Sequence, residues 1–190
     1  MKSTRIILVV TSLLLLASPV SAFDDNRKGF SLSLGLGLHS LSYDYSIYGE
    51  TVISESESGW ATSFKIGGGF SEQFQLYYLR NVSWYSASTE GESKTYTIGL
   101  TGVGGTYYLN PVSPTVYFTG GLGAGDITGL FDDHIRGDTG NASLLGVGYE
   151  FRPHVQLEAV LLSTDILISD FSTVELNTTS LQVTLNYHWY

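Results

Sequence analysis

Hydrophobic and polar residues alternate almost without interruption in GFSLSLGLGLH, residues 29–39. Phe30 and the leucines at 32, 34, 36 and 38 fall on one parity, whereas Ser31, Ser33, two glycines and His39 fall on the other. A period of two predicts a β-strand with two unlike faces. The leucines would point into the core of a soluble β-protein, but they would point outward at lipid in a membrane barrel.

The strand pattern returns in seven later segments of the chain. They are WATSFKIGGGF, FQLYYLRNVSWY, TYTIGLTGVGGTYYL, TVYFTGGLGAG, NASLLGVGYEF, HVQLEAVLLST and TTSLQVTLNYHWY. The connections run long, short, medium, short, long, short and long, with SEQ, NPVSP and RP as the short ones. Transmembrane barrels have tight turns at one rim and longer loops at the other, and about 9–11 tilted residues cross a bilayer. The pattern therefore predicts an all-β, eight-stranded, antiparallel up-and-down transmembrane β-barrel whose leucines face lipid.

Aromatic residues gather near the ends of the predicted strands, as in the two interfacial girdles of a membrane barrel. At the short-turn end they are Phe30, Phe70, Phe74, Tyr107, Tyr108, Tyr117, Phe118, Tyr149, Phe151, Tyr187 and Trp189. At the long-loop end they are Tyr43, Trp60, Trp84, Tyr85 and Tyr96.

The first residues carry the three parts of a secretory signal. Lys2 and Arg5 precede an apolar run, and Val20-Ser21-Ala22 offers a small-residue cleavage site. The apolar run is shorter than the roughly 20 residues that a spanning helix needs. We therefore expect a cleaved signal peptide at residues 1–22 and one barrel domain at residues 23–190.

Composition and charge narrow the classes of partner. The chain has no Cys, 22 Gly and 13 Tyr, and its nine Lys and Arg against eighteen Asp and Glu give a formal net charge of −9. Nucleic acid requires a basic surface, so no nucleic-acid partner is expected. Glycines and aromatic residues with few prolines are typical of an exported all-β protein. The spacing of the residues indicates no metal site and no cofactor.

The whole pattern resembles the small eight-stranded outer-membrane barrels: the OmpA transmembrane domain and its OmpX, OmpW and opacity-type relatives. The resemblance is architectural, covers residues 23–190, and includes an alternating last strand that acts as the insertion signal in this family. Tyr187 and Trp189 carry that stripe here, and Tyr190 follows one residue past it. The resemblance implies an integral, monomeric, porin-like protein of the Gram-negative outer membrane and cell envelope. Its partners would be outer-membrane lipid, lipopolysaccharide and the barrel-assembly machinery.

Charged residues on the inward parity define a candidate interior cluster. Lys65 and Glu158 fall at about the same depth, and Glu150 is also inward. Strict parity would place Arg80 on lipid, at a cost of about 2–4 kcal/mol. We therefore predict a β-bulge at Arg80-Asn81 that turns Arg80 inward, toward Glu158 and Glu150. Because eight strands leave little lumen, a salt-bridged and side-chain-filled interior is expected, with a gate or narrow ion path as the alternative.

The predicted outer loops are acidic, with Asp132, Asp133 and Asp138 as the densest group. Such carboxylates could join the divalent-cation network of lipopolysaccharide, although a solvated acidic surface is the simpler interpretation. The segment DDHIRGDTGN lacks the ligand spacing of a calcium loop.

These residues are compatible with three functions. The favoured one is a structural or surface-interaction barrel that works through its acidic loops. The second is a narrow channel for small or hydrophobic solutes, which polar inward residues argue against. The third is a lipid A-modifying enzyme, but none of the four His residues matches a His-x-Ser-Asn pattern. We therefore expect no catalytic activity.

Overall fold

The computed structural model describes residues 26–47, 50–89, 92–129, 138–167 and 174–190. The expected signal peptide, residues 1–22, lies outside them. Eight strands make up the described chain: β1 (Gly29–Ile47), β2 (Glu50–Gly69), β3 (Phe74–Thr89), β4 (Glu92–Tyr108), β5 (Thr115–Gly129), β6 (Asp138–Arg152), β7 (Val155–Leu167) and β8 (Val174–Trp189). Within these residues, no helix is long and apolar enough to cross a membrane.

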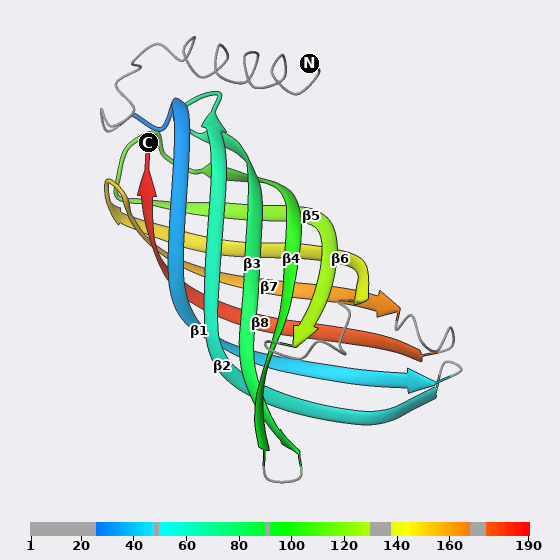
Figure 1. Ribbon diagram of the computed structural model, residues 1–190. Coiled ribbons are helices and arrows are strands. Elements are labelled where there is room, and N and C mark those ends of the chain that lie inside the picture. The colour runs from blue at the N-terminus through cyan, green and yellow to red at the C-terminus, as the bar shows by residue number, and fades with distance from the viewer. Residues whose placement is uncertain (1–25, 48–49, 90–91, 130–137, 168–173) are drawn as a thin grey trace, which may run out of the picture.

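The eight strands form one closed antiparallel barrel in sequence order. β1 closes the barrel by pairing with β8, from Leu32 opposite Trp189 to Ile47 opposite Val174. In Figure 1 the start of β1 and the end of β8 lie at the same end of the barrel. The predicted fold is thus confirmed.

The parity of the first strand is also confirmed. Leu34, Leu36 and Leu38 are 48%, 57% and 60% exposed on the outer face, whereas Ser31 and Ser33 are buried inside. Because successive side chains of a strand point to opposite faces, this one strand fixes which parity of its neighbours is inward.

The strands are longer than the sequence pattern predicts, and the extra length is at the end opposite the short turns. β1 and β2 remain paired out to Ile47 and Glu50, and β3 and β4 out to Thr89 and Glu92. Residues expected in the first two loops are therefore mostly in strands. These residues are rich in Ser and Glu and do not show the strand pattern, because the apolar alternation ends where the strand leaves the expected apolar band.

The aromatic residues divide between the wall and the interior. Trp60 is exposed on the outer face, as a girdle residue should be, but Tyr85 is buried inside. Tyr108 and Tyr117 at the short-turn end are likewise buried, with ring centroids 5.1 Å apart. The girdle prediction is wrong for these three tyrosines, because it used position along the strand and ignored parity.

The barrel interior has an apolar side and a polar side. The apolar side is a cluster from β3, β4, β6 and β7, made of Tyr77, Leu79, Leu100, Ala142, Leu144, Val160 and Leu162. The polar side comes from β1, β2 and β8 and includes Ser33, Ser63, Gln182, Thr184 and Asn186. The sequence reasoning expected the polar side and missed the apolar one.

Candidate functional site

Arg27 is buried in the short-turn end of the barrel. The residue precedes β1 and is 2% exposed. Its Nη2 donates to Glu150 Oε1 at 2.6 Å and to Ser113 Oγ at 3.1 Å. Its Nη1 donates to the backbone carbonyls of Glu72, Asn110 and Pro111. One guanidinium thus joins the β2–β3 turn, the β4–β5 turn and β6.

Two tyrosine rings lie against the Arg27 guanidinium. The Arg27 Cζ lies 4.1 Å from the centroid of the Tyr108 ring and 5.8 Å from that of Tyr190, within cation–π range. Tyr190 also donates a hydrogen bond to Glu150 Oε1 at 3.1 Å. Glu150 Oε1 therefore accepts hydrogen bonds from Arg27, Ser113 and Tyr190, and Glu150 is fully buried.

Burial and charge shift the pKa of Arg27 and the pKa of Tyr190, which both lie outside the strands. Burial alone would lower the pKa of Arg27, but the hydrogen bond and negative charge of Glu150 outweigh it, and the pKa is raised. Burial, followed by the charge of Glu150, raises the pKa of Tyr190 to about 12. Both groups are held in the protonation state that Glu150 can bind.

Lys65 and Glu158 form an ion pair at mid-barrel. The Lys65 Nζ lies 2.5 Å from Glu158 Oε2, with side-chain exposures of 9% and 0%. The ammonium also lies 5.3 Å from the centroid of the Tyr77 ring. The predicted pairing of Lys65 with Glu158 is confirmed.

Neutral hydrogen bonds cross the barrel closer to the long-loop end. Asn81 Nδ2 donates to Gln182 Oε1 at 3.1 Å, and Ser83 and Ser180 share a hydrogen bond of 2.8 Å. Beyond them, Leu41, Tyr85 and Ile98 form a second buried apolar cluster. Buried side chains thus contact one another across the interior at several successive levels.

The prediction for Arg80 is wrong. No register shift occurs at Arg80-Asn81 in the pairing of β3 with β2 or with β4. Arg80 keeps strict parity on the outer face, where its Nη2 donates to Asp126 Oδ2 at 2.8 Å and its Nη1 donates to Asp126 Oδ1. Glu150 pairs instead with Arg27. The four charges predicted to form one cluster are therefore divided among three separate ion pairs, two of which include a residue from outside the cluster.

The other predicted site residues lie as follows. Asp132 and Asp133 lie outside the described residues, and Asp138 is the first residue of β6 instead of a loop residue. Tyr187 is 45% exposed on the outer wall, whereas Tyr190 is buried in the short-turn end. Trp189 is partly exposed, and its ring centroid lies 4.7 Å from that of Tyr187. Their role as an insertion signal stays a prediction.

Sequence reasoning missed Arg27 and Asp126. Arg27 lies before the first alternating segment, so no periodicity points to it. Asp126 follows GGLGAG on the outward parity of β5, one residue past the end of the strand that the sequence predicts. A negative charge on that parity, which could pair with the outward Arg80, is the signal that the sequence offers.

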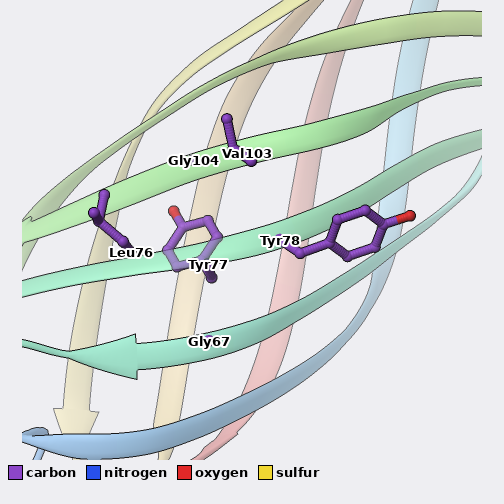
Figure 2. Close-up of a pocket in the computed structure, with 6 residues that line it drawn as sticks. All are labelled: Gly67, Leu76, Tyr77, Tyr78, Val103 and Gly104. Atoms are coloured by element: carbon purple, nitrogen blue, oxygen red, sulfur yellow. The ribbon is translucent and has the colours of Figure 1, made fainter. Parts of the chain in front are cut away.

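Two grooves lie on the outer wall near Arg80. The larger, about 440 Å³, is lined by Gly67, Leu76, Tyr77, Tyr78, Val103 and Gly104. Figure 2 shows the neighbouring rings of Tyr77 and Tyr78 leaving β3 in different directions, with Val103 on the adjacent strand. The second groove, about 310 Å³, is lined by Trp60, Thr62, Trp84, Tyr85, Ser86 and Thr95. Within the described residues, no group of three or more His, Cys, Asp or Glu could hold a metal ion.

Comparison with known proteins identifies the class of this barrel. A family model described as the outer membrane protein beta-barrel domain matches residues 10–188. The chain belongs to this family of bacterial outer-membrane barrels. Comparison with curated proteins finds no match.

Solved structures with the same fold include two further bacterial proteins. Ail, the attachment invasion locus protein of Yersinia pestis, is 15% identical with a TM-score of 0.52, over 84% of this chain and 99% of that chain. Neisserial surface protein A is 15% identical with a TM-score of 0.51, over 81% of this chain and 96% of that chain. At this identity the likeness concerns the fold alone.

Proposed function

We propose that this chain is a non-conducting barrel that presents its acidic outer strand ends and loops as an interaction surface. The observation that carries the proposal is the filled interior. Arg27 and Glu150 close the short-turn end, the Lys65–Glu158 pair lies at mid-barrel, and hydrogen-bonded and apolar side chains lie beyond it. A water-filled path would have to break ion pairs between buried charges, which is costly.

The barrel wall continues past the outer girdle, which supports a surface role. Asp44, Glu55 and Glu57 lie on paired strands, and Tyr43 donates a hydrogen bond to Glu55 at 2.6 Å. Carboxylates held on paired strands form a more rigid surface than carboxylates on free loops. Such a surface would attract cationic partners or divalent cations.

Planar-bilayer conductance of the refolded protein tests this proposal. We expect silence from wild type and from Ser163→Ala, a control on the exposed outer parity of β7. The test variant is Glu158→Ala, which removes one member of the mid-barrel pair. Silence in Glu158→Ala as well would support an interior blocked at several levels. Discrete conductance steps in wild type would overturn the proposal.

The apolar side of the interior favours one alternative, a narrow channel for small or hydrophobic solutes. Leu79, Leu100, Leu144 and Leu162 are each at most 2% exposed and line one side continuously. Steps that grow in Glu158→Ala would identify the ion pair as a gate and favour the channel.

The buried histidines support the absence of catalysis. His39 Nε2 lies 3.0 Å from the carbonyl oxygen of Trp84, and His188 Nδ1 lies 3.0 Å from Gln156 Nε2. Each ring is thus already held in a structural contact. Lipopolysaccharide incubated with the refolded protein should keep its acyl composition by mass spectrometry, and a lost acyl chain would contradict this view.

A further inference from the structure

The outer wall between β3 and β5 carries an ion pair where a membrane barrel should be apolar. Arg80 faces outward on β3 and Asp126 outward on β5, with side-chain exposures of 30% and 22%. Arg80 is opposite Thr101 on β4, whereas Asp126 is opposite Gly99, two residues nearer the long-loop end. The arginine side chain therefore runs across β4 toward the outer rim, as long cationic side chains do near interfaces.

Gly99 makes room for this arrangement. A Cβ at Gly99 would lie 3.0 Å from Arg80 Cζ and 2.7 Å from the Asn81 carbonyl oxygen. The guanidinium lies over the bare backbone of β4, where Thr101 Oγ1 accepts a hydrogen bond of 2.8 Å. A guanidinium has five N–H donors. Among the described residues, Thr101 and Asp126 accept three of them, which leaves two donors without an acceptor there.

A groove lined by aromatic rings and hydroxyl side chains lies next to the pair on its long-loop side. Val82 is the same-face residue between Arg80 and Trp84, and it is only 6% exposed. Beyond it the groove presents the Trp60 and Trp84 rings with the hydroxyl side chains of Thr62, Ser86 and Thr95. Trp84 Nε1 donates to Thr62 Oγ1 at 2.9 Å. This bond fixes the edge of the indole and leaves its face available.

An apolar groove lies on the short-turn side of the same ion pair. Tyr78 is opposite Val103 on β4. Arg80, opposite Thr101, is the next residue of β3 on the same face. Leu76, Tyr78 and Val103 form the groove's outward side chains, at 45%, 47% and 68% exposure. Figure 2 shows that Gly67 and Gly104 flank it without side chains. Along β3 the ion pair thus lies between the groove of aromatic and hydroxyl side chains and the apolar groove.

We propose that this face binds a phosphorylated glycolipid of the outer leaflet. The two free donors of Arg80 would bind the phosphate, the Trp60–Trp84 groove would hold the sugar, and the apolar groove would take an acyl chain. Aromatic rings beside hydroxyl groups match the alternating apolar and polar faces of a sugar. The order of the three features matches the order of head group and chain along a membrane normal.

The depth of the pair agrees with this assignment. Short turns mark the periplasmic rim of such barrels, so Trp60 and Trp84 belong to the outer girdle. Asp126 lies level with Val82, two residues below Trp84, which is about 7 Å along the strand. Head groups meet acyl chains at this level. The proposal rests on the family's place in the outer membrane and is independent of whether the interior conducts.

Tryptophan fluorescence of the full-length refolded barrel in detergent micelles tests the proposal. Trp60 and Trp84 are at the site, and the third tryptophan, Trp189, is near the other end of the barrel. The probes are bisphosphorylated lipid A, its dephosphorylated form, phosphatidylglycerol of equal chain length, and soluble glucosamine phosphate. The main variant is Arg80→Leu/Asp126→Leu, which keeps the wall apolar. The matched control is Ser143→Leu/Ser163→Leu, at exposed outer positions of β6 and β7.

We expect saturable binding of bisphosphorylated lipid A by wild type and by the control. The Arg80→Leu/Asp126→Leu variant should bind it about tenfold more weakly or worse, because a charged hydrogen bond is lost. If that variant fails to fold, Thr101→Val is the second variant. It keeps both charges but removes the hydroxyl that holds the Arg80 guanidinium in place, so it should weaken binding by about threefold. Equal affinity in wild type and the variants would overturn the site. Equal affinity for phosphatidylglycerol or the dephosphorylated lipid would overturn the phosphorylated glycolipid, and equal affinity for the soluble sugar phosphate would overturn the lipid.

Discussion

Lys65 on β2 and Glu158 on β7 form an ion pair of 2.5 Å across the barrel interior, although 93 residues separate them in the chain. The strands β2 and β7 are not neighbours in the wall, so the ion pair connects two separate parts of the wall across the interior. Removing one partner leaves the other charge buried and unpaired, which costs about 3–5 kcal/mol. Replacing both by apolar residues of similar volume is often neutral.

We therefore expect strong coupling in a double-mutant cycle. Lys65→Met and Glu158→Leu should each lower the free energy of unfolding by about 3–5 kcal/mol, whereas the double variant should be within about 1 kcal/mol of wild type. The measurement is urea unfolding of the barrel from lipid vesicles. Additive losses in the double variant would contradict a coupled pair.

Arg27 is expected to contribute to stability although it precedes the first strand. Arg27→Ala leaves Glu150 buried without its cation and frees three turn carbonyls, so the free energy of unfolding should fall by about 3–5 kcal/mol. Lys28→Ala, at an exposed position one residue later, is the control and should change it by less than about 0.5 kcal/mol. Urea unfolding of both variants measures the difference. Similar values for the two would mean that the short-turn end closes without Arg27.

The alternating residues of the chain predicted the barrel, its order of strands and the inward parity, because a period of two is a local property. Lys65 and Glu158 could be paired from sequence because both lie on the inward parity at similar depth. Arg80 could not be placed correctly in this way. A charge on the outer wall is tolerable only with a partner, and the partner Asp126 becomes visible only from the register of three strands.

The same limit explains the tyrosines and Arg27. Tyr85 and Tyr108 lie at strand ends, where girdle residues are expected, yet their parity directs them inward. Arg27 lies in a segment without periodicity, and besides Glu150 and Ser113 its partners are backbone carbonyls of two distant turns. Carbonyl groups have no side-chain signature in a sequence.

Tyr190 should make stability depend on alkaline pH. Its pKa is raised from the ordinary value of 10.0 for tyrosine to about 12 by burial and then by the charge of Glu150. The folded state therefore favours the protonated phenol. The stabilisation is complete below pH 10 and is lost as the pH rises from about 10 to 12. The free energy of unfolding of wild type, minus that of Tyr190→Phe, should be constant to about pH 9.5 and then fall, because other tyrosines cancel in the difference. A difference that stays flat to pH 12 would contradict the shifted pKa.

Gly148 and Gly120 should respond oppositely to a single added methyl group. The Tyr117 ring lies against the backbone of Gly148, and a Cβ there would overlap the ring carbons and the hydroxyl. Tyr117 is fully buried among the interior side chains, so the ring has little space to move. A Cβ at Gly120 would instead meet Leu145 Cδ2 at 3.4 Å, an ordinary contact on the outer wall.

Gly148→Ala should therefore lower the free energy of unfolding by about 1–3 kcal/mol, the usual cost of overpacking. Gly120→Ala should be neutral or raise it by up to about 1 kcal/mol, because alanine restricts the unfolded chain more than glycine does. Adding Tyr117→Phe to Gly148→Ala removes the hydroxyl but keeps the ring carbons, so it should recover only part of the loss. Urea unfolding from vesicles measures all three. Equal stability of Gly148→Ala and Gly120→Ala would show that the Tyr117 ring can be displaced at no cost, and that the interior is less tightly packed than the buried tyrosine indicates.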